Sequence, residues 1–227
     1  MTRRPAMIFA AGYGTRMRPL TLNLPKPLIP VAGHPLIDRA IATAREAGVE
    51  RIVVNLHYMG DRIRSHLADE AGILFSDETE RILDTGGGLK AARRLLEADE
   101  AFTLNPDAVW TGDNPLSRLA RAWPDMAADC LLLLSPVGTA LGYAGTGDFD
   151  LGPDGRVRRG NSFVYTGAQI IRLATLDAVP DHAFSLNLVW DRLARLGRLF
   201  GIVHEGSWCD VGRPENIRLA ERMLGHD

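Results

Sequence analysis

A glycine-containing segment near the N-terminus has the composition of a phosphate-binding loop. Residues 11–16 are Ala-Gly-Tyr-Gly-Thr-Arg, and they directly follow an apolar run, residues 6–10, that is typical of a short buried strand. Glycines let the backbone approach a phosphate closely and present several N–H groups to it. The fork-shaped guanidinium groups of Arg16 and Arg18 suit phosphate oxygens. Because ligands bind at the carboxyl ends of strands in open α/β sheets, the segment predicts a phosphate-binding loop.

Two other glycine-rich motifs fit this segment less well. A dinucleotide-binding fingerprint requires a third glycine that opens a helix, but Met17 stands at that position and Pro19 follows. A P-loop requires Gly-Lys-Ser or Gly-Lys-Thr, which the segment lacks. Gly12 and Gly14 alone are also compatible with an ordinary tight turn. The interpretation therefore depends on the residues that come next.

The residues after the loop carry a specific resemblance to a known family. Residues 18–21 are Arg-Pro-Leu-Thr and residues 24–28 are Leu-Pro-Lys-Pro-Leu. With the glycine loop they resemble the signature of the sugar-phosphate nucleotidyltransferases. The resemblance implies transfer of a nucleotidyl group from a nucleoside triphosphate to a sugar 1-phosphate, with Arg16 and Lys26 as catalytic residues. The nucleotide-binding residues that it implies here are Ala11, Gly12, Gly14, Thr15, Arg16 and Lys26.

Lys26 is unusual in this sequence on chemical grounds as well. Lysine and arginine together number 26, and only Lys26 and Lys90 are lysines. Where arginine serves almost everywhere else, a lysine indicates a need for a compact ammonium group. The prolines on both sides of Lys26 restrict the backbone and aim the ammonium at developing negative charge. Lys90 falls on the surface of an expected helix, where we favour a structural role.

A glycine cluster in residues 84–88, Asp-Thr-Gly-Gly-Gly, is expected to contact the nucleobase. The resemblance implies contacts from Thr85, Gly86 and Gly87, and backbone groups can recognise a base where no side chains intervene. A flexible connection is the alternative interpretation. The glycine triplet is most like that of uridylyltransferases that act on amino-sugar phosphates. Together with the compact length, the lack of a C-terminal β-helix repeat and a resemblance over nearly the whole chain, this triplet implies UTP as donor and N-acetylmuramic acid 1-phosphate as acceptor.

Two aspartates that are far apart in the sequence are expected to bind Mg²⁺. Residues 105–107, Asn-Pro-Asp, resemble the family's Asn-Gly-Asp element, although Pro106 replaces the usual glycine and would tilt the loop. Residues 208–212 match the family's Trp-x-Asp-x-Gly element. The resemblance implies Asp107 and Asp210 as metal ligands and Asn105 as a nucleotide-binding residue. Mg²⁺ prefers oxygen ligands, usually one or two carboxylates together with substrate phosphates.

The sugar side of the site is less distinct in the sequence. The resemblance places sugar contacts at Gly142, Asp148, Asn161, Thr166 and Gly167, although Asp148 fits a simple turn equally well. We expect no zinc site, because His57, His66 and His182 do not cluster in the sequence with cysteines or carboxylates.

The predicted reaction needs no general base. A phosphate monoester is already anionic, so catalysis consists of positioning two anions and neutralising the charge of the transition state. Lys26 and Mg²⁺ would do this, and Arg16 would stabilise the leaving pyrophosphate. A guanylyltransferase for mannose or heptose 1-phosphate and a glucose-1-phosphate nucleotidyltransferase remain alternatives. A non-catalytic sensing relative is disfavoured because Lys26, Asp107 and Asp210 are all present.

Strand-like runs alternate with helical periodicity, which predicts one α/β domain over residues 1–227. We expect a Rossmann-like (GT-A-type) fold, in which a mixed, mostly parallel sheet has helices on both faces. The glycine-rich residues 138–160 predict a small antiparallel insertion over the carboxyl edge of the sheet, on the sugar side. The expected strands are residues 6–10, 52–56, 73–75, 101–104, 129–134, 163–171 and 199–203. The expected helices are residues 36–47, 61–67, 88–98, 115–122, 187–196 and 213–224.

The composition favours small-molecule substrates. Hydrophobic residues make up 46% and charged residues 24% of the 227 residues, which is ordinary for a globular protein. The net charge of −2 indicates neither a nucleic acid nor an anionic membrane as partner. Two cysteines do not indicate a disulfide framework, and no apolar run approaches the roughly 18 residues of a membrane span. We expect a cytoplasmic monomer or homodimer.

Overall fold

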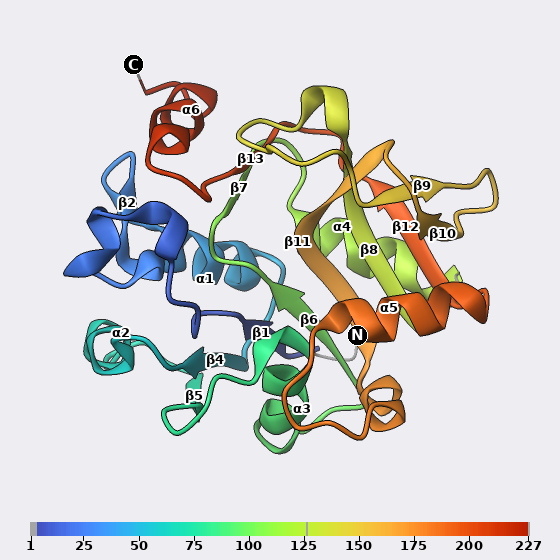
Figure 1. Ribbon diagram of the computed structural model, residues 1–227, viewed down its shortest axis with the longest axis horizontal. Helices are drawn as coiled ribbons and strands as arrows, with labels where there is room; N and C mark the ends of the chain where they lie inside the picture. Colours follow the sequence, from blue (N-terminus) through green and yellow to red (C-terminus); the bar gives the residue numbers. More distant parts are fainter. Residues whose placement is uncertain (1–3, 126, 227) are drawn as a thin grey trace.

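The computed structural model describes residues 4–125 and 127–226 and consists of a central sheet with helices on both faces (Figure 1). Its helices are α1 (Leu36–Glu46), α2 (Gly60–His66), α3 (Asp84–Leu96), α4 (Pro115–Ala122), α5 (Leu186–Arg195) and α6 (Glu215–Met223). Its strands are β1 (Ala6–Ile8), β2 (Pro30–Val31), β3 (His34–Pro35), β4 (Ile52–Leu56), β5 (Ile73–Asp77), β6 (Glu100–Leu104), β7 (Ala108–Trp110), β8 (Cys130–Pro136), β9 (Phe149–Leu151), β10 (Val157–Arg159), β11 (Phe163–Arg172), β12 (Leu199–Val203) and β13 (Trp208–Asp210). No helix in the described part of the chain is long and apolar enough to cross a membrane.

The large sheet is mixed but mostly parallel. Its strands follow the order β12-β8-β11-β6-β1-β4-β5, and the β9–β10 hairpin joins it beside β11. Strands β6, β1, β4 and β5 run parallel, as do β12 and β8. Strand β11 is antiparallel to both of its long neighbours, β6 and β8. This topology confirms the expected Rossmann-like α/β fold.

The alternation of side chains along the strands divides the core into two layers. In β1, Ala6 and Ile8 belong to the layer that is covered by α1, α2 and α4, whereas Met7 belongs to the layer under α3 and α5. All three side chains are fully buried. A strand that is buried on both faces has a continuous apolar run, and this explains why these short strands could be recognised in the sequence.

The glycine-rich segments show one expected and one unexpected feature. Residues 138–160 contain the expected antiparallel hairpin, β9–β10, which joins the large sheet at Phe163, the first residue of β11. Phe149 of β9 pairs with Phe163 and packs edge-to-face on Trp190 of α5, which holds the hairpin in the sheet. In addition, α3 begins at Asp84, so the glycine triplet forms its first turn and does not precede it.

Two short strand pairs were not predicted. Strand β13 pairs antiparallel with β7, with Trp208 opposite Trp110 and Asp210 opposite Ala108. Strands β2 and β3 form the other pair. Such short segments carry no period of their own, and the partners in the β7–β13 pair are far apart in the sequence. The β7–β13 pair matters most, because it brings a distant part of the chain to the end of β6.

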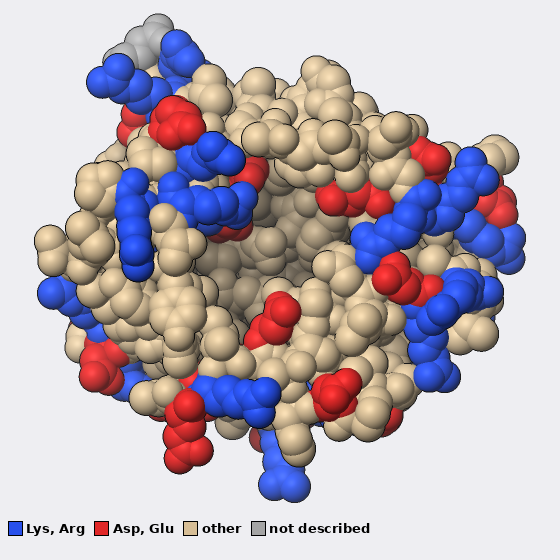
Figure 2. All heavy atoms as spheres, viewed as in Figure 1, with Lys and Arg blue, Asp and Glu red and all other residues tan. Residues whose placement is uncertain are grey.

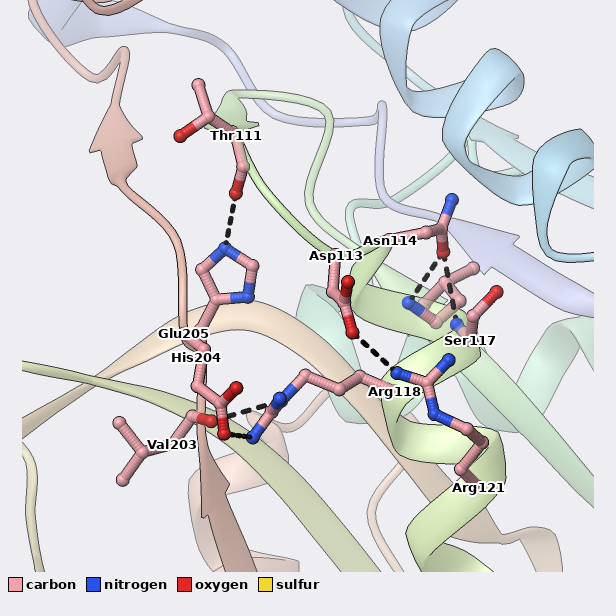
Figure 3. Close-up of polar contacts among 10 residues, drawn as sticks. Thr111, Asp113, Asn114, Ser117, Arg118, Arg121, Val203, His204 and Glu205 are labelled. Carbon is pink, nitrogen blue, oxygen red and sulfur yellow. Dashed lines mark hydrogen bonds and ion pairs between the residues drawn. The ribbon is translucent and has the colours of Figure 1, made fainter.

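A single polar side chain, Asn114, caps the start of α4, as Figure 3 shows, and also bonds to α1. Asn114 accepts hydrogen bonds at Oδ1 from the backbone N–H groups of Leu116 (3.0 Å) and Ser117 (3.1 Å). Its Nδ2 donates to the carbonyl oxygen of Thr43 in α1 at 2.8 Å. Asn114 therefore caps α4 and ties it to its neighbour on the same face of the sheet.

We predict that Asn114→Ala lowers the free energy of unfolding by about 1–2 kcal/mol, the usual range for loss of an N-cap. Urea denaturation followed by circular dichroism measures this. The matched control is Asp113→Ala, which removes an exposed ion pair with Arg121 and should cost less than about 0.5 kcal/mol. Equal losses in the two variants would contradict the capping role.

Candidate active site

A cavity of about 330 Å³ opens at the carboxyl ends of β1, β4 and β6. Figure 2 shows the hollow in this face of the molecule, with acidic and basic side chains around its rim. The predicted site residues that line the cavity are Ala11, Gly12, Gly14, Thr15, Arg16, Lys26, Thr85, Asn105 and Asp107. The structure thus gathers the phosphate loop, the Pro-Lys-Pro segment, one base-side residue and one metal-side residue around a single space.

The glycine loop and the lysine segment pack as one unit. Gly14 has φ +60°, and a Cβ atom added there would lie 2.9 Å from Cβ of Lys26 and 3.0 Å from Cγ2 of Thr21. The Thr21 hydroxyl donates to the carbonyl oxygen of Gly14 at 2.8 Å. Met17 is fully buried and anchors the far end of the loop. Gly14 is therefore required by its backbone angle and by its close approach to Lys26.

Lys26 forms an ion pair with Asp107. Its Nζ atom lies 2.5 Å from Oδ2 of Asp107, and the two side chains are only 15% and 21% exposed. Lys26 opens a short 3₁₀ turn after Pro25, and both Pro25 and Pro27 are buried. An ammonium and a carboxylate thus face each other in the wall of the cavity, on backbone that the prolines restrict.

Asp210 reaches the same place through the β7–β13 pair. Asp107 immediately precedes β7, and Asp210 lies opposite Ala108 in the ladder. Burial and the neighbouring Asp107 carboxylate raise the pKa of Asp210 to about 6, although Lys26, Arg16 and Arg213 act in the opposite direction. The N–H of Val211 donates to the carbonyl oxygen of Asp107 at 2.8 Å, so the strand pair brings the two aspartates to the same end of the sheet. Arg213, which was not predicted, joins the charges around them.

Asp107 and Asp210 provide a number of protein ligands that suits Mg²⁺ better than zinc. Among the described residues, no group of three or more His, Cys, Asp or Glu side chains could hold a metal ion by itself. A metal on Asp107 and Asp210 would therefore need further oxygen ligands from water or phosphate. Mg²⁺ commonly binds in this way, whereas a structural zinc site needs four protein ligands.

A buried histidine supports the β7–β13 pair from its other end (Figure 3). His204 donates from Nε2 to the carbonyl oxygen of Thr111 at 3.0 Å, since a carbonyl oxygen can only accept. Burial lowers the pKa of His204, which favours the neutral ring. The N–H of Ser207 donates to Oγ1 of Thr111 at 3.1 Å, and the N–H of Thr111 donates to the carbonyl of Ser207 at 3.0 Å. The segment that carries Asp210 is thus anchored before the strand begins.

On the base side, Gly86 and Gly87 have packing contacts that the sequence did not predict, and their contact with a base stays a prediction. The N–H groups of Gly86 and Gly87 both donate to the carbonyl oxygen of Phe184, at 2.8 and 3.0 Å. A Cβ atom on Gly86 would lie 2.3 Å from the Phe184 ring, and one on Gly87 would lie 2.2 Å from the carbonyl oxygen of His182. Both glycines are buried beneath this segment and do not line the cavity. Thr85 does line it, and its hydroxyl oxygen accepts from the N–H of Leu186 at 3.0 Å.

Lys90 belongs to the same packing arrangement. Its Nζ atom donates to the carbonyl oxygen of Val179 at 2.6 Å and lies 5.8 Å from the centre of the Phe184 ring. These contacts hold residues 179–184 on α3. They support the structural interpretation of this second lysine.

Three of the predicted sugar contacts have clear structural tasks. Gly142 has φ +73°, and a Cβ atom there would lie 2.4 Å from the carbonyl oxygen of Asp210. Thr166 is buried, and its hydroxyl donates to the carbonyl of Leu133 at 2.8 Å. Gly167 has φ +90° and would meet Cβ of Asn105 at 2.8 Å. These residues shape the backbone beside Asp210 and Asn105, and none of them lines the cavity.

The two remaining sugar-side residues lie in the segments that flank the β9–β10 hairpin. Asp148 accepts at Oδ2 from the N–H of Tyr165 at 2.9 Å and at Oδ1 from the hydroxyl of Tyr143 at 3.4 Å. The N–H of Asn161 lies 3.3 Å from Oδ1 of Asp150. Asp148 is therefore a bonded loop residue and Asn161 an exposed one. Neither lines the cavity, and their contact with a sugar stays a prediction.

Two buried polar residues of the cavity wall were missed in the sequence. Asn55 lies in β4 and is 3% exposed, and Glu78 follows β5 and is equally buried. The sequence did contain a signal for Asn55, because an asparagine that interrupts the buried apolar run of residues 52–56 needs a hydrogen-bond partner. Only the fold shows that Glu78, which directly follows the neighbouring strand β5, is that partner.

Comparison with known proteins identifies several relatives. The profile of a family described as "MobA-like NTP transferase domain" matches residues 6–140. The N-acetylmuramate alpha-1-phosphate uridylyltransferase of Caulobacter vibrioides is 40% identical over 96% of this chain and 96% of that protein. The protein of the same description from Neisseria meningitidis serogroup B is 33% identical over 97% and 98%. A crystal structure of HddC from Yersinia pseudotuberculosis complexed with GMP-PN has a TM-score of 0.78 at 23% identity, over 97% of this chain and 99% of that one, and so shares the fold.

We predict that Asp210→Asn stabilises the protein in the absence of divalent metal. The folded-state pKa of about 6 lies above the ordinary value of 3.8. As the pH rises from about 4 to about 7, the unfolded chain releases this proton before the folded protein does, so the wild type loses stability relative to the variant. The expected difference at pH 7.5 is about 1–3 kcal/mol.

Thermal unfolding of both proteins from pH 4 to 8, in the presence of a chelator, tests this. The control is Asp69→Asn, an exposed residue after α2, for which we expect no pH-dependent difference. A gain from Asp210→Asn that is the same at every pH would show that the charge of Asp210 is not its cause.

Proposed function

This chain belongs to the MobA-like NTP transferase family and is a nucleotidyltransferase that acts on a sugar 1-phosphate, and we propose that its donor is UTP and its acceptor N-acetylmuramic acid 1-phosphate. The products would be UDP-N-acetylmuramic acid and pyrophosphate. The observation that carries the proposal is the 40% identity to the Caulobacter vibrioides uridylyltransferase, which covers 96% of both chains. The likeness thus includes the sugar-side segments as well as the phosphate loop.

The proposed reaction is an in-line displacement. An oxygen of the sugar 1-phosphate attacks the α-phosphorus of UTP, and the bond from that phosphorus to the oxygen bridging to the β-phosphate breaks. No proton has to be removed from the nucleophile, because a phosphate monoester is already anionic. The barrier comes from bringing two anions together, and it is lowered by fixed positive charge and by positioning.

The cavity supplies that positive charge. Arg16 lines it, is exposed and has no hydrogen-bond or ion-pair partner among the described residues, so its guanidinium is available for the leaving pyrophosphate. Lys26 lines the same cavity and is held by Asp107. In the proposal Asp107 and Asp210 hold Mg²⁺, which would neutralise phosphate charge when it is bound. The backbone of the glycine loop would contact the triphosphate.

The rest of the proposal concerns the remaining parts of the chain. We place the sugar near the loops that contain Gly142, Asp148 and Asn161, which follow β8 and flank the β9–β10 hairpin.

We treat residues 1–227 as one domain, because strands from both ends of the chain share the large sheet. We also place the enzyme in the cytoplasm. Its two cysteines, Cys130 and Cys209, are free and buried, as is usual in a reducing compartment.

The substrates can be tested with a panel of nucleoside triphosphates and sugar 1-phosphates, with release of pyrophosphate as the readout. We expect kcat/KM for UTP with N-acetylmuramic acid 1-phosphate to exceed that of every other pair by at least about tenfold. A preference for GTP with mannose or heptose 1-phosphate would contradict the proposal and favour a guanylyltransferase. A preference for glucose 1-phosphate would reassign the acceptor alone.

We predict that Lys26→Ala lowers kcat by about 10²–10³-fold, the usual effect of removing one group that stabilises transition-state charge. Pyrophosphate release at saturating substrates measures this, and circular dichroism verifies the fold. Lys90→Ala is the matched control, because it removes the only other lysine but breaks contacts on the outside of α3. It should lower the melting temperature and leave kcat within about twofold. Full activity of Lys26→Ala would refute the catalytic role.

A further inference from the structure

The glycine loop has no backbone hydrogen bonds of its own where it borders the cavity. Among the described residues, no other part of the chain accepts from the N–H groups of residues 11–14. A Cβ atom added to Gly12 would meet no atom within 4 Å beyond its chain neighbours. These N–H groups are therefore free for a phosphate, and contacts elsewhere have to hold the loop in shape.

The side chain of Tyr13, in the middle of the loop, contacts the segment that follows β4. Its hydroxyl oxygen lies 2.9 Å from Nε2 of His57, and the two rings meet edge-to-face with their centres 5.2 Å apart. The ring of Tyr58, the next residue of that segment, lies 5.7 Å from the Tyr13 ring. Because β4 pairs with β1, these contacts fix the loop to the end of the neighbouring strand.

The partners of His57 define which of its ring nitrogens carries the hydrogen. Nδ1 lies 2.7 Å from the backbone carbonyl oxygen of Glu78, and a carbonyl oxygen can only accept, so Nδ1 is the donor. In the neutral ring Nε2 is then an acceptor, and the Tyr13 hydroxyl donates to it. His57 thus links the loop after β1 to the backbone after β5.

A second link from the same segment reaches the other half of the loop. The Tyr58 hydroxyl donates to the carbonyl oxygen of Thr21 at 2.8 Å. Thr21 is 1% exposed, and its own hydroxyl donates to the carbonyl oxygen of Gly14 at 2.8 Å. Two adjacent residues after β4 therefore hold two adjacent residues of the glycine loop.

The aromatic side chains of these links lie outside the cavity. Tyr13, His57 and Tyr58 do not line it, whereas Gly12 and Gly14, on either side of Tyr13, both do. The Tyr13 side chain is also largely open to solvent, at 48% exposed. The route from Tyr13 and His57 to a bound nucleotide is therefore the backbone of the loop.

From this we infer that Tyr13 and His57 are positioning residues, whose hydrogen bond holds the N–H groups of the phosphate loop ready before the nucleotide arrives. A loop that is ordered in advance loses less conformational freedom on binding, so it binds its ligand more tightly. Once the triphosphate is bound, its own contacts hold the loop, and the rate at saturation depends little on Tyr13. The inference rests on the proposed function only in taking UTP as the triphosphate.

The variant Tyr13→Phe tests this, because it removes the hydroxyl group and keeps the ring. We expect KM for UTP to rise about 3- to 10-fold, the usual effect of losing one uncharged hydrogen bond, and kcat to stay within about twofold. Release of pyrophosphate at saturating sugar 1-phosphate measures both constants. Calorimetric titration of UTP with Mg²⁺ and without sugar phosphate should show the same loss of affinity.

A double-mutant cycle shows whether His57 is the partner through which Tyr13 acts. In a His57→Phe background the acceptor is already gone, so adding Tyr13→Phe should raise KM for UTP by less than about 1.5-fold. His66→Phe is the matched control background, because His66 is an exposed histidine of α2 that bonds to Asp38 at 2.7 Å. In that background Tyr13→Phe should keep its full effect on KM.

Three results would overturn the inference: an unchanged KM in Tyr13→Phe, a fall in kcat without a change in KM, or an equal effect of Tyr13→Phe with and without His57. A wild type that does not use UTP contradicts the proposed function instead. The same variants are then measured with the triphosphate that the substrate panel selects, because the loop binds phosphates that all of them share. The two failures are thus told apart.

Nitrogen NMR of isotope-labelled histidine rings provides a readout that needs no variant of His57, in case His57→Phe does not fold. The protein is measured without nucleotide, so the spectrum reports the loop before UTP binds. We expect His57 to carry its hydrogen on Nδ1, and we expect Tyr13→Phe to move its Nε2 resonance while the resonances of His66 stay in place. Histidine resonances that are identical in the wild type and in Tyr13→Phe would refute the inference.

Discussion

The repulsion between two aspartates that the fold holds together is the constraint on which the site depends. Asp107 and Asp210 meet because β7 pairs with β13, and the raised pKa of Asp210 is the electrostatic consequence. The fold resists this repulsion with buried apolar contacts behind the pair, the hydrogen bonds of Thr111 with His204 and Ser207, and the close approach of Gly142. The same negative charge that destabilises the empty protein is what a divalent cation with bound phosphates would neutralise.

The two cations of the site, Lys26 and Arg16, differ in how tightly the structure holds them. Lys26 is fixed by its prolines, by contact with Gly14 and by the Asp107 carboxylate, whereas Arg16 stays exposed at the rim of the cavity. In the proposed reaction, a held ammonium suits the reacting centre, whose geometry must be constant. An exposed guanidinium suits a pyrophosphate that has to leave. The different packing of the two residues is consistent with these two proposed roles.

Much of the fold was predictable because its helices and central strands carry their own patterns. The run of residues 52–56 and the periodicity of residues 36–47 identify β4 and α1 to within a residue. The packing role of the glycine cluster was not predicted, because a glycine that opens a surface and one that admits a neighbouring side chain look alike in a sequence. Phe184, which fills the space beside Gly86, lies far along the chain and has no motif of its own. Glu78 was not predicted because it also has no motif of its own, and its partner Asn55 lies in another part of the chain.

The sequence by itself determined the chemistry: a glycine loop, a lysine between two prolines and two aspartates in recognisable surroundings imply phosphate binding and nucleotidyl transfer. It also determined the α/β class, since hydrophobic periodicity is a local property. Only the tertiary structure decided which residues share the cavity. The meeting of Asp107 with Asp210, the engagement of the Gly86 and Gly87 N–H groups by Phe184 and the pairing of Asn55 with Glu78 all join segments that are distant in the chain. Such contacts depend on strand pairing and packing in three dimensions, which short-range patterns do not encode.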